Sequence, residues 1–98
     1  MKHIKDSERY SIVQLQGFKE ECFICHKPSS DIHECFGGYN RQASKDYGLC
    51  VSLCRACHDR AHNDKEARRH LEQVGKRAFM EWYEDLELFR KVFHKYYV

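Results

Sequence analysis

The sequence lacks long hydrophobic runs and has a single proline and five glycines among its 98 residues. A membrane-spanning helix needs about 20 consecutive apolar residues, and no such stretch occurs here. The first residues, MKHIKDSERYSIVQLQ, contain no apolar segment of the kind that defines a secretory signal. We therefore expect an intracellular protein without a membrane partner.

The chain also has little net charge, +2 at neutral pH, although 33% of its residues are charged. A polycation that coats nucleic acid is thereby excluded, and any nucleic-acid surface must come from local clustering of basic side chains. There is no internal repeat and no low-complexity tract. The length corresponds to one small domain, of a size that often depends on a metal or on disulfides.

What the chain does have is six cysteines, four of which form two Cys-x-x-Cys pairs. Without an export signal we do not expect three disulfides, and the paired spacing is typical of metal ligands. Cys35 and Cys50 remain, and we expect both to be reduced, partly buried small hydrophobic residues.

The N-terminal part divides into an arm and a metal knuckle. Residues 1–21 are weakly patterned, and RYSIVQLQ (residues 9–16) indicates a short strand or an arm. Residues 22–30, CFICHKPSS, indicate a knuckle followed by a turn around Pro28. We expect a core over residues 22–63 and a helical extension over residues 64–98.

The core should contain a β-hairpin with a long connection. Residues 32–36 (IHECF) and 49–54 (LCVSLC) have the composition of short strands. Residues 36–48, FGGYNRQASKDYG, are polar and glycine-bearing, so we expect a loop there.

Helices should follow the hairpin. One is expected from near Arg55 through His62, and the spacing of Asn63 and Glu66 predicts that a capping box starts another. A break near Asp85 would give a last helix from Leu86 to Tyr96. Apolar residues recur at helical spacing through this region. An aromatic set should belong to the core: Phe79, Trp82, Tyr83, Phe89, Phe93 and Tyr96.

The two Cys-x-x-Cys pairs, Cys22 with Cys25 and Cys54 with Cys57, predict one structural zinc site. Thiolates are preferred zinc ligands, and four of them fill a tetrahedral ion and leave no open position. Two separate redox motifs are the alternative, but neither pair lies in a thioredoxin-like context.

A second set of residues is left over once the cysteines are assigned. His58 and His62 are four residues apart, so they lie on one face of the expected helix and can chelate one divalent ion. His33 is on the strand that the hairpin brings toward that helix. Three histidines leave open positions on the ion, as a catalytic metal needs. Glu34 stands next to His33 and could accept a proton from water. A surface pair of histidines is the alternative.

The stretch IHECFGGYNRQASKDYGLCVSLCRACHDRAH (residues 32–62) resembles the HNH endonuclease motif, most closely that of small nucleases encoded by phages and prophages. The resemblance runs from Cys22 to about His62 and extends weakly into RAFMEWY and FRKVFHKYYV. It implies an α+β fold: a small ββα-metal, treble-clef-like domain with a four-cysteine zinc site and C-terminal helices. It also implies metal-dependent cleavage of DNA in the cytoplasm of a bacterial host cell.

By this resemblance, His33, His58 and His62 are the ligands of a catalytic divalent ion such as Mg²⁺, Mn²⁺, Ni²⁺ or Zn²⁺. Glu34 takes the place of the general-base histidine of many family members. Asn40 and Arg41 match the family's Asn-Arg pair.

Two departures from the family pattern bear on these roles. Glu34 is a carboxylate and therefore a weaker base than histidine unless burial raises its pKa. His33 as the base and Glu34 as the ligand is the alternative, although we favour His33 as a ligand. The position of the family's usual asparagine is Leu49, so either Asn40 supplies the hydrogen bonds that brace the loop or no residue does.

For DNA binding we expect Arg41 first and then Lys45, Arg55 and Arg60, because arginine binds phosphate with two parallel hydrogen bonds. A solvated surface is the alternative for each. Residues 67–70 and 75–77 add a basic band, but the acidic neighbour EWYEDLE favours an ordinary mixed-charge surface. No base-reading motif stands out, so contacts should be mainly to the backbone.

Two other classes of function compete with the nuclease. A non-catalytic treble-clef zinc module that binds nucleic acid or protein explains the cysteines equally well. A small assembly factor would use the aromatic C-terminal helices. A homodimer is compatible with the sequence, which shows no dimer face.

Overall fold

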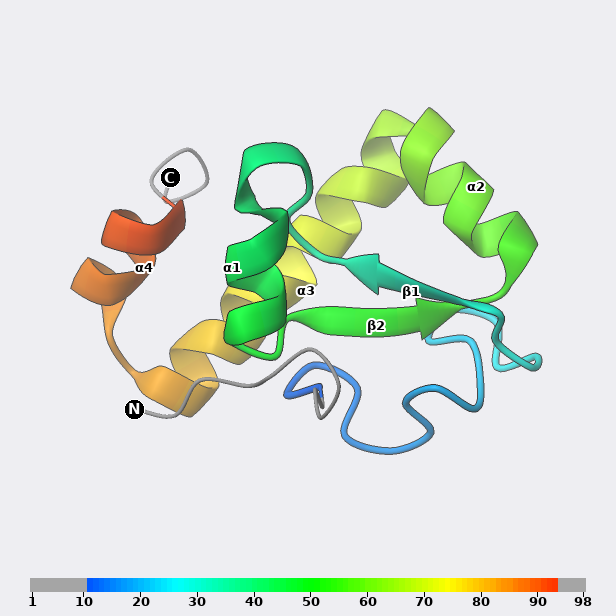
Figure 1. Cartoon of the computed structure of the whole chain (residues 1–98), viewed down its shortest axis with the longest axis horizontal. Coiled ribbons are helices and arrows are strands. Elements are labelled where there is room, and N and C mark those ends of the chain that lie inside the picture. The colour runs from blue at the N-terminus through cyan, green and yellow to red at the C-terminus, as the bar shows by residue number, and fades with distance from the viewer. Residues whose placement is uncertain (1–10, 94–98) are drawn as a thin grey trace.

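The computed structural model describes residues 11–93, in which a two-stranded sheet is followed and flanked by helices (Figure 1). Helix α3 passes behind the hairpin, with α2 near one end of α3 and α4 near the other. The elements, in chain order, are β1 (Asp31–Glu34), the 3-10 helix η2 (Gly38–Asn40), α1 (Arg41–Asp46), β2 (Cys50–Leu53), α2 (Arg55–Asn63), α3 (Lys65–Tyr83) and α4 (Leu86–Phe93).

The predicted hairpin is present, with both strands slightly shorter than expected. Strands β1 and β2 are antiparallel, and His33 lies opposite Val51. All four residues of β2 are buried, whereas His33 is the one buried residue of β1 and its other three residues are partly exposed. One face of β1 therefore carries polar groups toward the helix that follows β2.

The connection between the strands is not the loop that we predicted. Residues 38–46 form η2 and α1. Gly38 has φ +58°, a left-handed value that glycine adopts without strain. The buried hydroxyl of Ser44 accepts from Phe36 N at 3.1 Å and donates to Phe36 O at 2.8 Å. These two bonds fasten α1 to the end of β1 and stabilise a helix that hydrophobic patterning does not reveal.

The segment before the knuckle forms no strand over residues 11–16, and residues 9 and 10 lie outside the described part. It is nevertheless attached to β2 through its side chains. The buried Gln14 accepts from Ser52 N at 2.8 Å and donates to Glu21 O at 2.9 Å. Of the two predicted forms, residues 11–16 therefore take that of an arm, which buried hydrogen bonds hold in place.

Helix α2 covers the predicted range, but the cap of the next helix is one residue later than predicted. Asn63 is the last residue of α2, and Asp64 caps α3 by accepting from Glu66 N at 3.0 Å. The break near Asp85 is present, because Glu84 ends α3 in the left-handed conformation with φ 52°. Helix α4 is described as far as Phe93, so its predicted end at Tyr96 lies outside the described residues.

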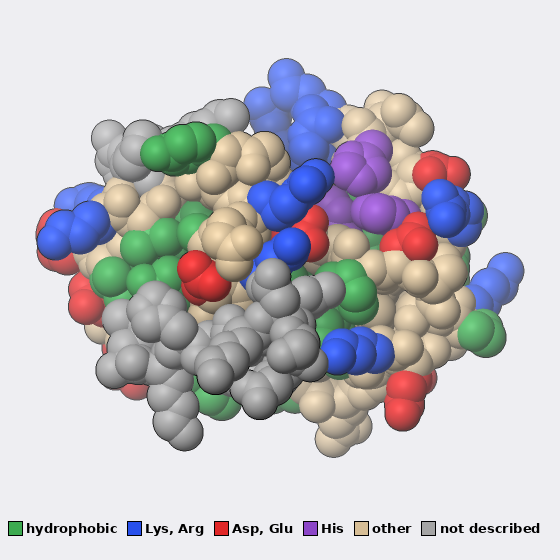
Figure 2. Space-filling view, viewed as in Figure 1, with side chains coloured by type: hydrophobic (Ala, Val, Ile, Leu, Met, Phe, Trp, Pro, Cys, Tyr) green, Lys and Arg blue, Asp and Glu red, His purple; other side chains and the backbone are tan. Residues whose placement is uncertain are grey.

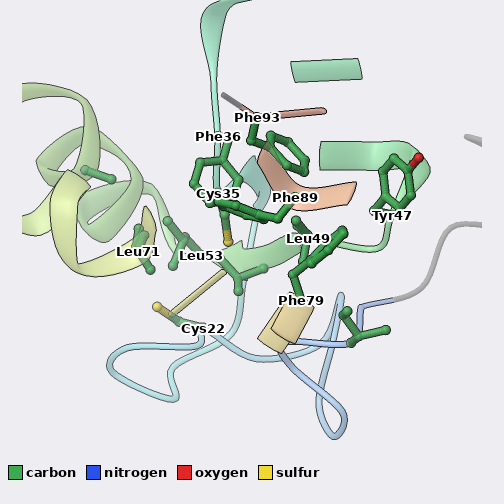
Figure 3. Close-up of a cluster of buried hydrophobic side chains, with 13 residues drawn as sticks. Cys22, Cys35, Phe36, Tyr47, Leu49, Leu53, Leu71, Phe79, Phe89 and Phe93 are labelled. Carbon is green, nitrogen blue, oxygen red and sulfur yellow. The ribbon is translucent and has the colours of Figure 1, made fainter. Parts of the chain in front are cut away.

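The core is built from aromatic side chains of the helices against the hairpin (Figure 3). Phe79, Phe89 and Phe93 are fully buried, as predicted, and Phe36 packs against the last two with ring centroids 5.7 and 4.7 Å apart. Trp82 is 53% exposed, so its assignment to the core was wrong. The buried residues of α3 are spaced four apart, at Leu71, Gly75 and Phe79, and Trp82 lies beside this row rather than on it.

The two cysteines outside the paired motifs are thiols, as expected, and are fully buried, deeper than the partial burial we expected. Cys35 and Cys50 have exposures of 1% and 0%. Gly75 of α3 lies against Cys35, since a Cβ at that glycine would come within 2.8 Å of the Cys35 Cβ. Burial raises the pKa of the Cys35 thiol, which stays protonated.

Among residues 11–93, no helix combines the length and the apolar character that crossing a membrane requires.

Candidate functional site: two clusters of metal-ligating side chains

The four cysteines of the paired motifs come together, as predicted. Their sulfur atoms all lie within 4.8 Å of one another, and we call this group the cysteine cluster: Cys22, Cys25, Cys54 and Cys57. Cys22 and Cys25 belong to the knuckle before β1, whereas Cys54 caps α2 and Cys57 lies in its first turn. The cluster therefore joins the start of the hairpin to the start of α2.

Local backbone geometry shapes the knuckle. Cys22 N donates to Lys27 O at 2.6 Å, and His26 N donates to Cys22 O at 2.9 Å. His26 has φ 67°, a left-handed value that is uncommon outside glycine and reverses the chain after Cys25. This turn directs both sulfurs to the same side.

The cysteine cluster fits a zinc ion. Two sulfurs bound at about 2.3 Å to a tetrahedral ion lie about 3.8 Å apart. The Cys25 and Cys54 sulfurs are 3.7 Å apart. Four thiolates complete the coordination of such an ion, so the cluster could hold a structural metal and leaves no position for a reactant.

The protonation of the cysteine cluster favours a cation. Burial alone would raise the pKa of Cys22, but backbone hydrogen bonds from Cys25, Cys54 and Ile24 lower that pKa to about 6. Burial and hydrogen bonds to the other three sulfurs raise the pKa of Cys57 to about 12. A divalent ion bound to these sulfurs would take the place of the thiol protons.

The three predicted histidines also come together. One ring nitrogen of each lies within 4.8 Å of the others, and we call His33, His58 and His62 the histidine cluster. His58 and His62 are one turn apart on α2, and His33 reaches them from β1 with ring centroids 5.4 and 5.8 Å away.

The spacing within the histidine cluster fits a metal as well. The Nε2 atoms of His58 and His62 are 3.1 Å apart. Two nitrogens bound at about 2.0–2.1 Å to a tetrahedral ion lie about 3.3–3.4 Å apart. Asp31 Oδ2 bonds His58 Nδ1 at 2.9 Å, so the nitrogen of that ring that faces His62 is Nε2.

His33 supplies an independent sign that this cluster favours a cation. Its side chain is 6% exposed, and its Nε2 is buried without a hydrogen-bond partner among the described residues. Burial, together with the neighbouring His58 and His62, lowers the pKa of His33 to about 4. The ring is therefore neutral at neutral pH, the form in which imidazole binds a metal.

A pocket of about 520 Å³ opens beside the histidine cluster. Figure 2 shows histidine side chains at the surface near α2 and β1, with lysine and arginine side chains gathered next to them. The lining includes His33 and His62 from the cluster. The other charged or polar residues that line the pocket are Glu34, Tyr39, Asn40, Arg41, Lys65, Arg68, Arg69 and Glu72.

The predicted DNA-binding residues divide into two groups. Arg41 lines the pocket, and its Nε lies 3.5 Å from Glu34 Oε1. Lys45, Arg55 and Arg60 are not among the lining residues. Arg55 lies 3.4 Å from Asp31, behind His58, and Arg60 pairs with Asp64 at 3.5 Å.

Asn40 is buried and lines the pocket, but its side chain does not cap α1. The bonds that brace the connection come from Ser44 instead. Leu49, which stands where the family carries an asparagine, is fully buried in the core. Its backbone N donates to Ser44 O at 2.8 Å and its O accepts from Cys35 N at 2.9 Å.

Sequence reasoning missed Asp31, which orients His58. A signal was present, because residues two apart on a strand point to the same face, so Asp31 shares the face of His33. The hydrogen bond with His58, helped by the charge of Arg55, lowers the pKa of Asp31. The placement of Lys65, Arg68 and Arg69 around the pocket had no such signal, since it depends on the angle between α2 and α3.

Comparisons with protein-family models, with curated proteins and with solved structures find no match for this chain.

Proposed function

We propose that this protein is a metal-dependent endonuclease of the HNH kind that hydrolyses DNA phosphodiester bonds. One observation carries the proposal. Three imidazoles converge beside a pocket, and one of them has a buried nitrogen that finds no hydrogen-bond partner within residues 11–93. A purely structural zinc module has no use for this second cluster.

His33, His58 and His62 would hold the catalytic ion. A divalent ion bound there supplies Lewis-acid chemistry, since it polarises a phosphoryl oxygen and stabilises the charge that develops on it. Asp31 contributes as the carboxylate that holds the His58 ring in place, a partner that metal-ligating histidines commonly have. Three protein ligands leave room for substrate oxygens.

Glu34 is the residue that we assign as general base, with His33 as a ligand. Its carboxylate opens into the pocket beside His33 and is 17% exposed. It would accept the proton of the attacking water. The water oxygen bonds to phosphorus as the bond to the 3′ oxygen breaks, and the products are a 5′-phosphate and a 3′-hydroxyl. The ring of His33 lies against two other imidazoles, which suits a ligand better than a base.

Arg41 is the residue that we assign to the substrate phosphate. Its guanidinium is paired with Glu34 at the pocket wall, and a phosphate can replace a carboxylate in such a pair because both accept two parallel hydrogen bonds. Release of Glu34 from Arg41 when DNA binds would also make this carboxylate available as a base.

The proposal is tested by incubating supercoiled plasmid with the zinc-loaded protein and Mg²⁺, Mn²⁺, Ni²⁺ or Zn²⁺. We expect nicking that stops when EDTA is added. The variant His58→Ala should lose at least about 100-fold in rate. His70→Ala removes an exposed histidine of α3 that belongs to neither cluster and serves as the matched control.

Absence of nicking with every metal, or equal nicking by His58→Ala and the wild type, would favour the non-catalytic zinc module. Concentration-dependent assembly without any DNA binding would favour the assembly factor instead.

A further inference from the structure

Tyr39 is an aromatic side chain with no role in the packing of the fold. It lies in η2 and is 94% exposed, the highest value among the exposed large hydrophobic side chains of residues 11–93. Five such side chains occur in that range, and Tyr39 is the one that lines the pocket beside the histidine cluster.

The surroundings of Tyr39 are open. It follows Gly37 and Gly38, and a Cβ at either glycine would have nothing within 4 Å. Both glycines also line the pocket. Part of the pocket wall is therefore a turn of two glycines without side chains, followed by the exposed ring of Tyr39.

The other side of the pocket is basic. Lys65, Arg68 and Arg69 line it from the first turns of α3. Together with Arg41 they outnumber the two lining carboxylates, Glu34 and Glu72. Arg68 also donates to His62 O at 3.3 Å, which holds this basic edge against the histidine cluster.

We propose that this pocket binds an unpaired nucleotide next to the scissile phosphate, with the base stacked on Tyr39 and the adjoining phosphates bound by Lys65, Arg68 and Arg69. The preferred substrate is then DNA that is single-stranded at the cut site. This inference rests on the proposed nuclease function for the identity of the scissile bond. The pairing of an exposed aromatic ring with a basic groove does not depend on it.

Physical reasoning favours an unpaired base over a duplex. Within a duplex both faces of each base are stacked on neighbouring bases, so a protruding ring finds a free face only where a strand is unpaired. Aromatic platforms combined with basic grooves are the usual means of binding single strands. The volume of about 520 Å³ is within the range of about 300–1,000 Å³ that holds small organic groups.

Binding should be measured by fluorescence anisotropy in a catalytically silent variant, Glu34→Gln, so that cleavage does not interfere. Three DNA probes of equal length and sequence are compared: a single strand, a full duplex, and a duplex with about six unpaired nucleotides at its centre. We expect the single strand and the interrupted duplex to bind at least about tenfold more tightly than the full duplex.

Tyr39→Ala should weaken binding of the single strand by about 5- to 150-fold, while Tyr39→Phe should restore it, because stacking needs the ring and not the hydroxyl. Trp82→Ala is the matched control, since Trp82 is also an exposed aromatic residue but does not line the pocket.

Arg69→Ala should weaken binding. It should also make the slope of the logarithm of the binding constant against the logarithm of salt concentration shallower by about 0.7, the value for one phosphate contact to a single strand. Arg77, an exposed residue of α3 outside the pocket, provides the matched control in Arg77→Ala.

Equal binding of single strand and duplex, or undiminished binding by Tyr39→Ala, would overturn this inference even if the plasmid is still nicked. If the protein binds single strands preferentially through Tyr39 but nicks no DNA, the nucleotide pocket is supported and the proposed nuclease function is contradicted.

Discussion

The cysteine cluster and the histidine cluster are neighbours on one helix, yet their surroundings differ. Each set of ligand atoms lies within 4.8 Å, and α2 contributes two residues to the histidine cluster and one, plus its cap, to the cysteine cluster. The cysteine cluster has four sulfurs, enough to surround an ion. The histidine cluster has three nitrogens, and two of its residues, His33 and His62, line a pocket. Proximity of ligands therefore does not by itself distinguish a structural site from a reactive one, whereas ligand number and access do.

The two clusters also differ in how they are held. Backbone hydrogen bonds of the knuckle orient the cysteines, as the bonds of Cys22 to Lys27 and His26 show. A side chain, Asp31, orients His58. We therefore expect changes in the cysteine cluster to act on folding and changes in the histidine cluster to act on chemistry.

The largest effect should come from Cys54→Ser. Loss of one of four ligands weakens the metal site, and in small domains the binding energy of a structural zinc is folding energy. A domain of ordinary stability, about 5–15 kcal/mol, should then lose its cooperative thermal transition. Circular dichroism on heating and metal analysis by mass spectrometry would measure both properties.

Cys35→Ala is the control for that experiment, because it removes a cysteine outside the cluster and should keep the zinc. A Cys54→Ser protein that melts like the wild type would contradict a structural role for the cysteine cluster.

Glu34→Gln should have the next largest effect. Removal of a general base lowers the rate by about 10²–10⁴-fold, while the amide keeps the size of the side chain. We expect the melting temperature and the affinity for the second metal ion to stay unchanged, as measured by titration with Mn²⁺. Glu81→Gln, an exposed change on α3 outside the pocket, should behave as the wild type.

If Glu34→Gln instead loses metal affinity together with activity, the roles are exchanged, with Glu34 the ligand and His33 the base.

Asp31→Asn should have a smaller effect, confined to the histidine cluster. Loss of the carboxylate that orients a ligating histidine typically costs about 10- to 100-fold in metal affinity or activity. The zinc of the cysteine cluster should remain at full stoichiometry. Asp59→Asn changes an exposed aspartate of α2, the helix that carries His58, and serves as the control. Equal loss from both clusters would show that Asp31 supports the fold rather than one site.

The smallest effect should come from Gly75→Ala, which probes the packing of α3 against the residues that follow β1. The new methyl group would meet the Cys35 Cβ at 2.8 Å and Phe36 Cε2 at 3.1 Å. Overpacking of this kind lowers the free energy of unfolding by about 1–3 kcal/mol. Urea denaturation would measure it. Gly37→Ala, where nothing lies within 4 Å, should change that free energy by less than about 0.5 kcal/mol.

Much of the candidate site could be predicted from spacing alone. The intervals between Cys22 and Cys25, and between His58 and His62, specify which side chains share a turn or a helical face. A thiolate pair at such spacing has few other uses, whereas a histidine pair at helical spacing is also common on a surface. The inclusion of His33 depended on the hairpin expected before that helix. The hairpin and α2 followed from composition in the same way.

Other features depended on contacts between segments that are distant in the sequence. The Ser44 bonds to Phe36 fasten α1 to the chain after β1, and Trp82 stays exposed beside the buried row of α3 that includes Phe79. Neither feature leaves a periodic pattern in the sequence.

What the sequence by itself determined is the set of ligands, since these depend on residue type and on distances of a few positions along the chain. What only the tertiary structure decided is the environment of those ligands. His33 is buried where α2 packs against β1, with His58 and His62 beside it. The packing of α3 against α2 brings Lys65, Arg68 and Arg69 to the pocket, where Tyr39 stays exposed. Burial and access depend on how whole elements pack, a property that no short stretch of sequence contains.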